Sequence, residues 1–296
     1  MNRKPLPLHL LVRDPRHFQI LALGSLLLYG VLALDLEVRA LQALAMLATA
    51  LLAQYAATLL TRHASTALRW GAPPQPFDPR SALISGLSLC LLLRTNHLAL
   101  AMLAALLAIG SKFALRWRGK HLFNPTCFGI VATMLATGQA WISPGQWGSA
   151  AYLAFLLVCL GGLVVNRAAR SDVTFAFLAC YLALLFGRAW WLGQPASIPL
   201  HQLGSGALLI FAFFMISDPK TTPDSRAGRV AFAALVALGA GFIQFVLYRR
   251  NGLVLSLACL SLAVPVLDRL LPGKRYAWRD SPAASPDPSL LERRFA

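Results

Sequence analysis

The chain has 296 residues, of which 57% are hydrophobic and 13% are charged, and its formal net charge is +16. Soluble domains carry about 25% charged residues, so this composition excludes an ordinary soluble protein and indicates a polytopic membrane protein. Nucleic-acid binding is also excluded, because the basic residues lie between apolar runs rather than on one face of a helix.

The apolar residues fall into ten segments, and each is predicted to be a helix that takes part in the membrane domain. A complete span needs about 20 residues, with a lower limit of about 17. The segments are 18–36, 41–61, 81–95, 97–116, 124–142, 147–166, 171–190, 203–217, 229–248 and 251–270. Residues 1–17 are therefore expected to form a cytoplasmic N-terminal segment. Residues 271–296 are expected to form a tail whose Pro, Ser and charged residues are typical of disorder.

Two of these segments, 81–95 and 203–217, are too short to span a membrane, and each is the third in its half of the chain. Paired short segments at matching positions indicate an internal repeat. Because each half holds five segments, the halves 18–142 and 147–270 would have opposite orientations. The predicted fold class is an all-α integral membrane protein with about ten transmembrane helices, built as two inverted five-helix repeats. A chance pairing of the two short segments is the alternative.

The distribution of basic residues predicts the orientation of the chain. With the N-terminus inside, the two tails and the even-numbered loops hold 21 of the 27 Lys and Arg residues, and the odd-numbered loops hold five. By the positive-inside rule, both termini are expected to be cytoplasmic. The five cysteines lie singly in apolar runs, so we expect no disulfide framework, no bound metal and no iron–sulfur cluster.

The first candidate site comprises polar residues at the ends of apolar segments. Asn124-Pro125-Thr126 opens the fifth segment, and Asp218 closes the short eighth segment shortly before Thr221 and Thr222. A helix N-terminus with free N–H groups suits a flavin phosphate or another anion. A carboxylate at the mouth of an apolar segment is costly in lipid, so it is paired, hydrated or functional.

Both motifs also have a purely structural interpretation, which stays open at this point. Asn124 and Pro125 form a good helix N-cap and first turn without any ligand. The turn at Asp218 is equally typical of a helix stop. Its carboxylate would then be satisfied by one of three nearby cations, Lys220, Arg226 or Arg229.

Three charged residues of the first half are candidates for an ion path or for its charge partners. Lys112 lies inside the segment 97–116, and Asp78 and Arg80 directly precede the segment 81–95. A cation inside a membrane segment is a functional candidate by default. The alternatives are that Lys112 extends its head group to the interface and that Arg80, like Lys120, is an anchor on the inner side.

Three ordered motifs together resemble one protein family. They are Lys120–Pro125 (KHLFNP), Phe213–Pro219 (FFMISDP) with Gly228-Arg229, and Asn251-Gly252 with Val264–Asp268 (VPVLD). They are similar to motifs of the RnfD/NqrB family, whose members are membrane subunits of Rnf-type electron-transport complexes and of the sodium-pumping NADH:quinone oxidoreductase. The resemblance implies a fold like that of urea transporters and a bacterial inner-membrane location. It also implies flavin-dependent electron transfer with other redox subunits as partners.

The chain departs from this family at the site of covalent flavin attachment. Family members carry FMN on the Thr of an S-G-A-T-type motif, whereas the corresponding region, residues 139–150, reads QAWISPGQWGSA. We therefore expect no covalent FMN, and consider FMN or riboflavin bound non-covalently, or quinone, as ligands. The chain also has no Gly-rich nucleotide-binding loop, so NADH oxidation is not expected here.

Three roles follow as hypotheses. The first is a membrane subunit of an electron-transport system that takes part in transmembrane electron transfer, with coupled ion transport as a further option. The second is a flavin-free transporter or channel for a small solute or ion on the same fold. The third is a structural assembly subunit.

Overall fold

The computed structural model describes residues 14–33, 38–68, 77–143 and 151–276, with backbone alone for 33, 64–68 and 151–157. Most of the expected N-terminal segment 1–17 lies outside the described residues, as do residues 277–296 of the tail. Residues 144–150, in the region where the family attaches FMN, also lie outside them.

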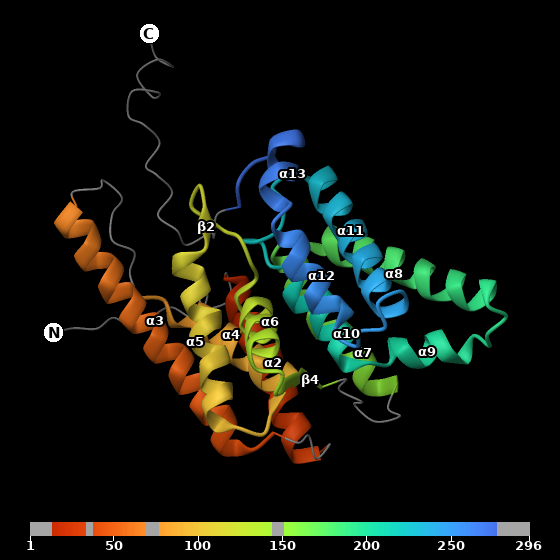
Figure 1. Ribbon diagram of the computed structural model, residues 1–296, viewed down its shortest axis with the longest axis horizontal. Helices are drawn as coiled ribbons and strands as arrows, with labels where there is room; N and C mark the ends of the chain where they lie inside the picture. Colours follow the sequence, from red (N-terminus) through yellow and green to blue (C-terminus); the bar gives the residue numbers. More distant parts are fainter. Residues whose placement is uncertain (1–13, 34–37, 69–76, 144–150, 277–296) are drawn as a thin grey trace, which may run out of the picture.

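The described residues are mostly helical, and every one of the ten predicted segments contains a helix (Figure 1). The helices of the first half are α2 (Pro15–Ala33), α3 (Ala40–Leu68), α4 (Pro79–Leu92), α5 (Leu98–Ala114) and α6 (Pro125–Thr137). Those of the second half are α7 (Ala151–Arg167), α8 (Ser171–Trp191), α9 (Ser197–Leu203), α10 (Gly206–Ile210), the π-helix η1 (Phe211–Met215), α11 (Arg226–Phe245), α12 (Gly252–Ser261) and α13 (Val264–Leu270). The seven-residue α9 was not predicted, because it is far too short to read as a span.

The all-α prediction is wrong in one respect, since the described chain also holds four short strands. β1 (Leu93–Thr95) pairs antiparallel with β4 (Ala140–Ile142), and β2 (Arg116–Trp117) pairs with β3 (Lys120–His121). Backbone N–H and C=O groups between two helices need partners when they are shielded from water. The β1–β4 ribbon supplies these partners where α4 and α6 end.

Helix length and composition support a membrane protein, but with fewer complete spans than predicted. Among the described residues, three helices are long and apolar enough to cross a membrane, namely Ala40–His63 of α3, α8 and α11. The pair α12 and α13, bent by 54°, would make a fourth. Five further apolar helices of the described chain have only 10–17 residues, so helix length does not support the predicted count of about ten complete spans.

Exposed apolar side chains show which surfaces suit lipid. On α3, four leucines are 66–70% exposed, and a long helix with so much exposed apolar surface would be unfavourable in water. They are Leu41, Leu44, Leu52 and Leu60. The apolar exterior of α3 therefore fits contact with lipid.

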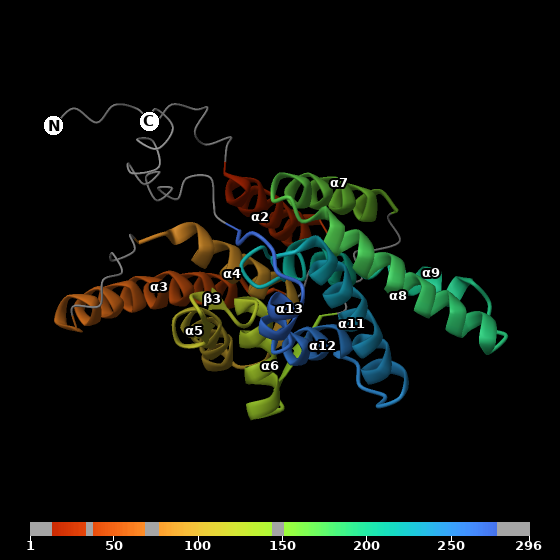
Figure 2. The same cartoon turned by 90° about the horizontal axis from the view of Figure 1, so that it is seen from above.

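The two halves pack their helices in a similar order. In the first half α5 contacts both α3 and α6, and in the second half α11 contacts both α8 and α12. The halves meet where α2 contacts α7 and where α6 contacts α12 (Figures 1 and 2). Within the second half, glycine permits the close approach of α12 to α11. A Cβ on Gly252 of α12 would lie only 2.7 Å from the Ala240 carbonyl oxygen of α11.

The short third segment of the second half is irregular. It consists of α10 followed by η1, whose five residues are all buried. Two hydroxyl groups bind carbonyl oxygens of this turn. Thr174 Oγ1 donates to the Ala212 oxygen at 2.8 Å, and Ser217 Oγ donates to the Phe213 oxygen at 2.6 Å. Single π-helical turns occur frequently at functional sites, and this one leads directly to Asp218.

Candidate functional site

Asn124 and Asp218, which are 94 residues apart in sequence, lie in contact. Asn124 caps α6 through its side-chain oxygen, which accepts from the Cys127 amide at 3.0 Å. Its Nδ2 donates to the Met215 carbonyl oxygen at 3.2 Å and to Asp218 Oδ2 at 3.4 Å. The capping interpretation is therefore confirmed, and the same amide also joins α6 to the end of η1.

The Asp218 carboxylate is stabilised by N–H groups rather than by an ion pair. Its Oδ1 accepts from the Lys220 backbone amide at 3.0 Å, and its Oδ2 faces Asn124. Among the described residues it forms no ion pair, although three cations follow within eleven positions. Arg229 pairs instead with Asp172 at 2.6 Å, so an ion pair between Asp218 and Arg229 is ruled out.

The three candidate threonines are buried, with exposed fractions of 4% for Thr126, 5% for Thr221 and 1% for Thr222. Thr221 Oγ1 donates to the Asp218 carbonyl oxygen at 3.4 Å. Thr222 Oγ1 accepts from Arg170 Nε at 3.2 Å. The hydroxyl groups of the Asp218 turn therefore support the turn itself.

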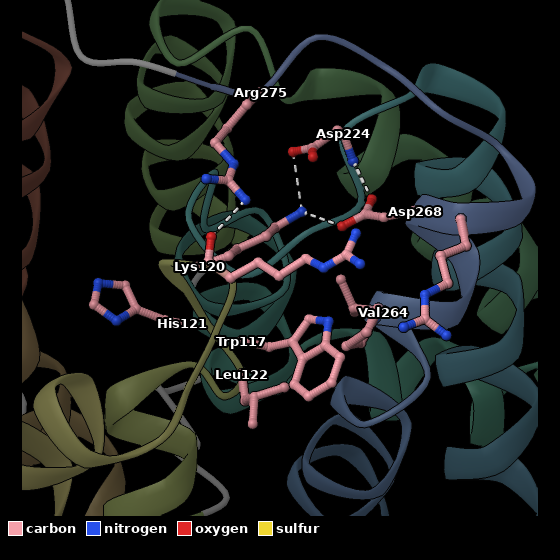
Figure 3. A pocket seen from close by; sticks show the side chains of 11 residues that line it. Trp117, Lys120, His121, Leu122, Asp224, Val264, Asp268 and Arg275 are labelled. Carbon is pink, nitrogen blue, oxygen red and sulfur yellow. Dashed lines mark hydrogen bonds and ion pairs between the residues drawn. The ribbon is translucent and has the colours of Figure 1, made fainter.

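The third motif joins the same end of the molecule through Asp268. Lys120 Nζ lies between two carboxylates of the second half, 2.7 Å from Asp268 Oδ2 and 3.0 Å from Asp224 Oδ1 (Figure 3). The Asp224 amide donates to Asp268 Oδ1 at 2.8 Å. Parts of all three motifs noted in the sequence thus meet where α6 begins and α13 ends, whereas Asn251 lies at the other end of α6, where its Nδ2 contacts Met134. Lys120 is a bridge between the halves rather than only an anchor.

A pocket of about 170 Å³ adjoins this ion-pair cluster. It is lined by the β2–β3 hairpin, by Asp224 and by the end of α13 with Arg275. The hairpin loop is Arg118-Gly119, with φ values of 49° and 79°, which are typical of a type I′ turn. This turn directs residues 117–121 toward the second half. Burial and the charges of Arg116, Lys112 and Lys220 lower the pKa of His121 to about 3, so its imidazole is neutral at pH 7.

Lys112 is buried inside the first half. Only 5% of it is exposed, and its Nζ donates to Gln54 Oε1 of α3 at 2.7 Å. Gln54 is itself 7% exposed. The alternative that Lys112 extends to the surface is therefore wrong. The pair places a cation and an amide between α3 and α5, in the apolar part of the molecule.

Asp78 and Arg80 belong to a separate cluster with Asp14 and Arg16. Arg80 Nη1 lies 2.5 Å from Asp14 Oδ2, and Arg16 in turn pairs with Asp78. Each arginine also binds the aspartate two residues before it. Two Asp-Pro-Arg tripeptides, each opening a helix, thus exchange ion pairs.

The two arginines lower the pKa values of both carboxyl groups in this cluster. Burial alone would raise the pKa of Asp14 and Asp78, but hydrogen bonds from Arg16 and Arg80 and the charges of these arginines outweigh it. Both pKa values therefore lie below the ordinary value. Within the described residues this cluster makes no hydrogen bond to Lys112 or Asp218, although the charge of Asp78 acts on Lys112 from a distance.

The sequence prediction missed Asp14, Arg16, Gln54 and Asp224. For the first two a signal was present, because Asp14-Pro15-Arg16 repeats the Asp78-Pro79-Arg80 pattern. No local pattern marks Gln54 or Asp224. Their roles depend on which helices pack together.

Comparison with known proteins places this architecture in a family. Residues 135–277 match the sequence model of the NQR2, RnfD, RnfE family. The chain belongs to this family. The matched region includes Asp218 and Asp268 but begins after Asn124, so two of the three converging motifs fall inside it.

Curated relatives are distant and longer. The chain is 28% identical over 162 residues to the D-type subunit of the ion-translocating oxidoreductase complex of Erwinia tasmaniensis, which covers 53% of this chain and 41% of the relative. It is 31% identical over 160 residues to the protein of the same name from Klebsiella pneumoniae, with 52% and 41% covered. The chain spans about two fifths of the length of these relatives.

Proposed function

We propose that this chain is a membrane subunit of an RnfD-like electron-transport complex and takes part in moving electrons across the bacterial inner membrane. The observation that carries this proposal is the contact of Asn124 with Asp218, beside the Lys120–Asp268 ion pair. It gathers the family-like motifs into one polar site. The relatives' name, which makes them part of an ion-translocating oxidoreductase complex, supports the same role and implies partner proteins that supply the electrons.

We also propose that the membrane domain, residues 18–270, consists of two inverted repeats with both termini cytoplasmic. The shared packing order α3–α5–α6 and α8–α11–α12 supports this arrangement, as do the short third segments α4 and α10–η1. Five spans in each half are needed for the inversion. The cytoplasmic side would then be the end that carries the polar site.

Flavin is proposed to bind without a covalent bond. The three threonines near the site are buried, and a phosphoester on any of them would have to displace the surrounding turn. The described pocket does not fit a whole flavin either, because ligand pockets for molecules of this size measure about 300 Å³ or more. We therefore derive no electron-transfer step through it. Asn124, Pro125, Thr126, Asp218, Thr221 and Thr222 remain the proposed residues of a flavin or quinone site, and because all but Asp218 are buried, a ligand would contact them only after the Asp218 turn opens.

A second candidate function is a flavin-free transporter or channel. The buried pair of Lys112 and Gln54 favours it, because a cation inside a membrane segment is costly unless it serves a pathway. In that role Lys112 would line the path, with Asp78 and Arg80 as charge partners near its entrance.

Spectroscopy of the protein purified from its own host in mild detergent separates these two functions. For the electron-transport function we expect partner proteins and a flavin absorption band to co-purify, and we expect denaturation to release the flavin. A denaturing gel under ultraviolet light should show no fluorescent band at 32.0 kDa. A family member with the S-G-A-T motif, treated identically, is the positive control. A pure chain without flavin or partners would contradict the electron-transport proposal and favour transport.

A further inference from the structure

The pocket beside the Lys120 ion pairs carries an excess of positive charge. Lys120 lies between Asp224 and Asp268, as Figure 3 shows, so these three residues together carry one negative charge. Three further cations line the pocket, namely Arg118, Arg269 and Arg275, and none of them forms an ion pair within the described part of the chain. Their contacts leave donors free. The Arg269 guanidinium lies 5.9 Å from the centre of the Trp117 ring, and Arg275 Nη2 donates to the Arg118 carbonyl oxygen at 2.8 Å.

The chemistry of this lining suits a phosphate group. Guanidinium groups present planar pairs of N–H donors that match phosphate oxygens. A volume of about 170 Å³ holds a phosphate with a few waters, since one water takes about 30 Å³ of liquid. His121, which is neutral at pH 7, adds no charge.

An apolar strip leads away from the pocket along α13. Leu262, Val266 and Leu270 are 58%, 53% and 71% exposed. Val266 and Leu270 are four residues apart and so lie on one side of α13, and Leu262 lies in the bend between α12 and α13. Trp117, at the edge of the pocket, is 45% exposed. A soluble phosphate compound would make no contact with this apolar strip. A lipid, by contrast, places its headgroup beside tryptophan and its acyl chains along apolar side chains.

We propose that the pocket binds the phosphodiester headgroup of an anionic phospholipid. Arg118, Arg269 and Arg275 hold the phosphate, and one acyl chain follows Leu262, Val266 and Leu270. Basic pockets at the cytoplasmic end of membrane helices recognise lipids in this way. The proposal rests on the membrane placement of α12 and α13 given above, but not on electron transfer.

The test is lipid retention in purified protein, measured by native mass spectrometry after exchange into detergent with phosphatidylglycerol or phosphatidylcholine. We expect the wild type to retain phosphatidylglycerol in preference to phosphatidylcholine. We expect the double variant Arg269→Gln/Arg275→Gln to lose about ten-fold in retention, because each arginine near the membrane surface attracts anionic lipid. The matched control is Arg249→Gln/Arg250→Gln, which removes the same charge from two exposed positions between α11 and α12.

Four results would overturn the proposal. Equal retention of the two lipids would show that charge does not select the ligand. An equal loss in the control variant would assign the effect to overall charge. Stabilisation by inorganic phosphate in a thermal unfolding assay, without retained lipid, would assign the pocket to a soluble phosphate compound. Size-exclusion profiles that match the wild type show that both variants are folded. Flavin in a preparation that retains no lipid would contradict this inference and leave the proposed function intact.

Discussion

Two regions of this protein contain nearly the same tripeptide, Asp-Pro followed by a basic residue, but the aspartate has different partners in each. Asp-Pro-Arg occurs at residues 14–16 and 78–80, where the two aspartates and two arginines exchange ion pairs. Asp-Pro-Lys occurs at residues 218–220, where the carboxylate faces an amide and a backbone N–H and forms no ion pair among the described residues. Removing one member of a buried, paired cluster is strongly destabilising, whereas a carboxylate without an ion pair at the end of an apolar segment is a candidate for function. From this difference we propose a structural role for the first region and a functional role for the second.

The largest expected effect is on stability, in the paired region. Asp14 is 2% exposed and binds both Arg16 and Arg80, so Asp14→Asn removes one of the two carboxylates that these arginines share, at its most buried position. We expect a loss of about 3 to 5 kcal/mol in the free energy of unfolding. This loss of stability can be measured by thermal unfolding in detergent and by the amount of the variant that accumulates in membranes.

The variant Asp78→Asn is the matched comparison for Asp14→Asn. The Asp78 side chain is 27% exposed, so water solvates the arginines when its charge is removed. We expect a smaller effect, near the lower end of the roughly 1.5 to 3 kcal/mol typical of hydrogen bonds to charged groups. Equal effects of the two substitutions would mean that burial does not set the strength of this cluster.

The next effect is the pH dependence of stability. The folded-state pKa values of Asp14 and Asp78 are lowered, so their contribution is complete above the unfolded-state value of about 4 and is lost as the pH falls toward the folded-state values. We expect the unfolding temperature of the wild type to fall below about pH 4, and Asp78→Asn to show a shallower fall. Parallel curves for the two proteins would contradict the assignment.

The smallest stability effect is expected at the helix cap of the candidate site. Asn124→Ala removes the bond to the Cys127 amide and the contact with Asp218, and a lost cap costs about 1 kcal/mol. That loss is too small to unfold a protein of this size. If Asn124→Ala fails to accumulate in membranes while Thr137→Ala, at the far end of α6, accumulates normally, the residue is chiefly structural.

Much of this architecture follows from the sequence. Apolar runs located a helix in each of ten segments, because burying apolar surface dominates the energetics of membrane helices. The cap at Asn124 and the stop at Asp218 were predictable from Asn-Pro and Asp-Pro, whose preferences are local. The contact between them was not, since it depends on how two helices 94 residues apart pack. The pairing of Lys112 with Gln54, and the β1–β4 ribbon, escaped prediction for the same reason.

The most direct test compares Asp218→Asn with Asp78→Asn in the same host membranes. The quantity is the redox activity that deletion of the gene removes, divided by the amount of the protein present. Asn keeps the shape of Asp218 and can still accept from the Lys220 amide, so we expect near-normal accumulation and a loss of activity of at least about ten-fold, the equivalent of about 1.4 kcal/mol. For Asp78→Asn we expect reduced accumulation with unchanged activity per molecule. Full activity per molecule in Asp218→Asn, or an equal loss in Asp78→Asn, would contradict the functional role of the unpaired carboxylate.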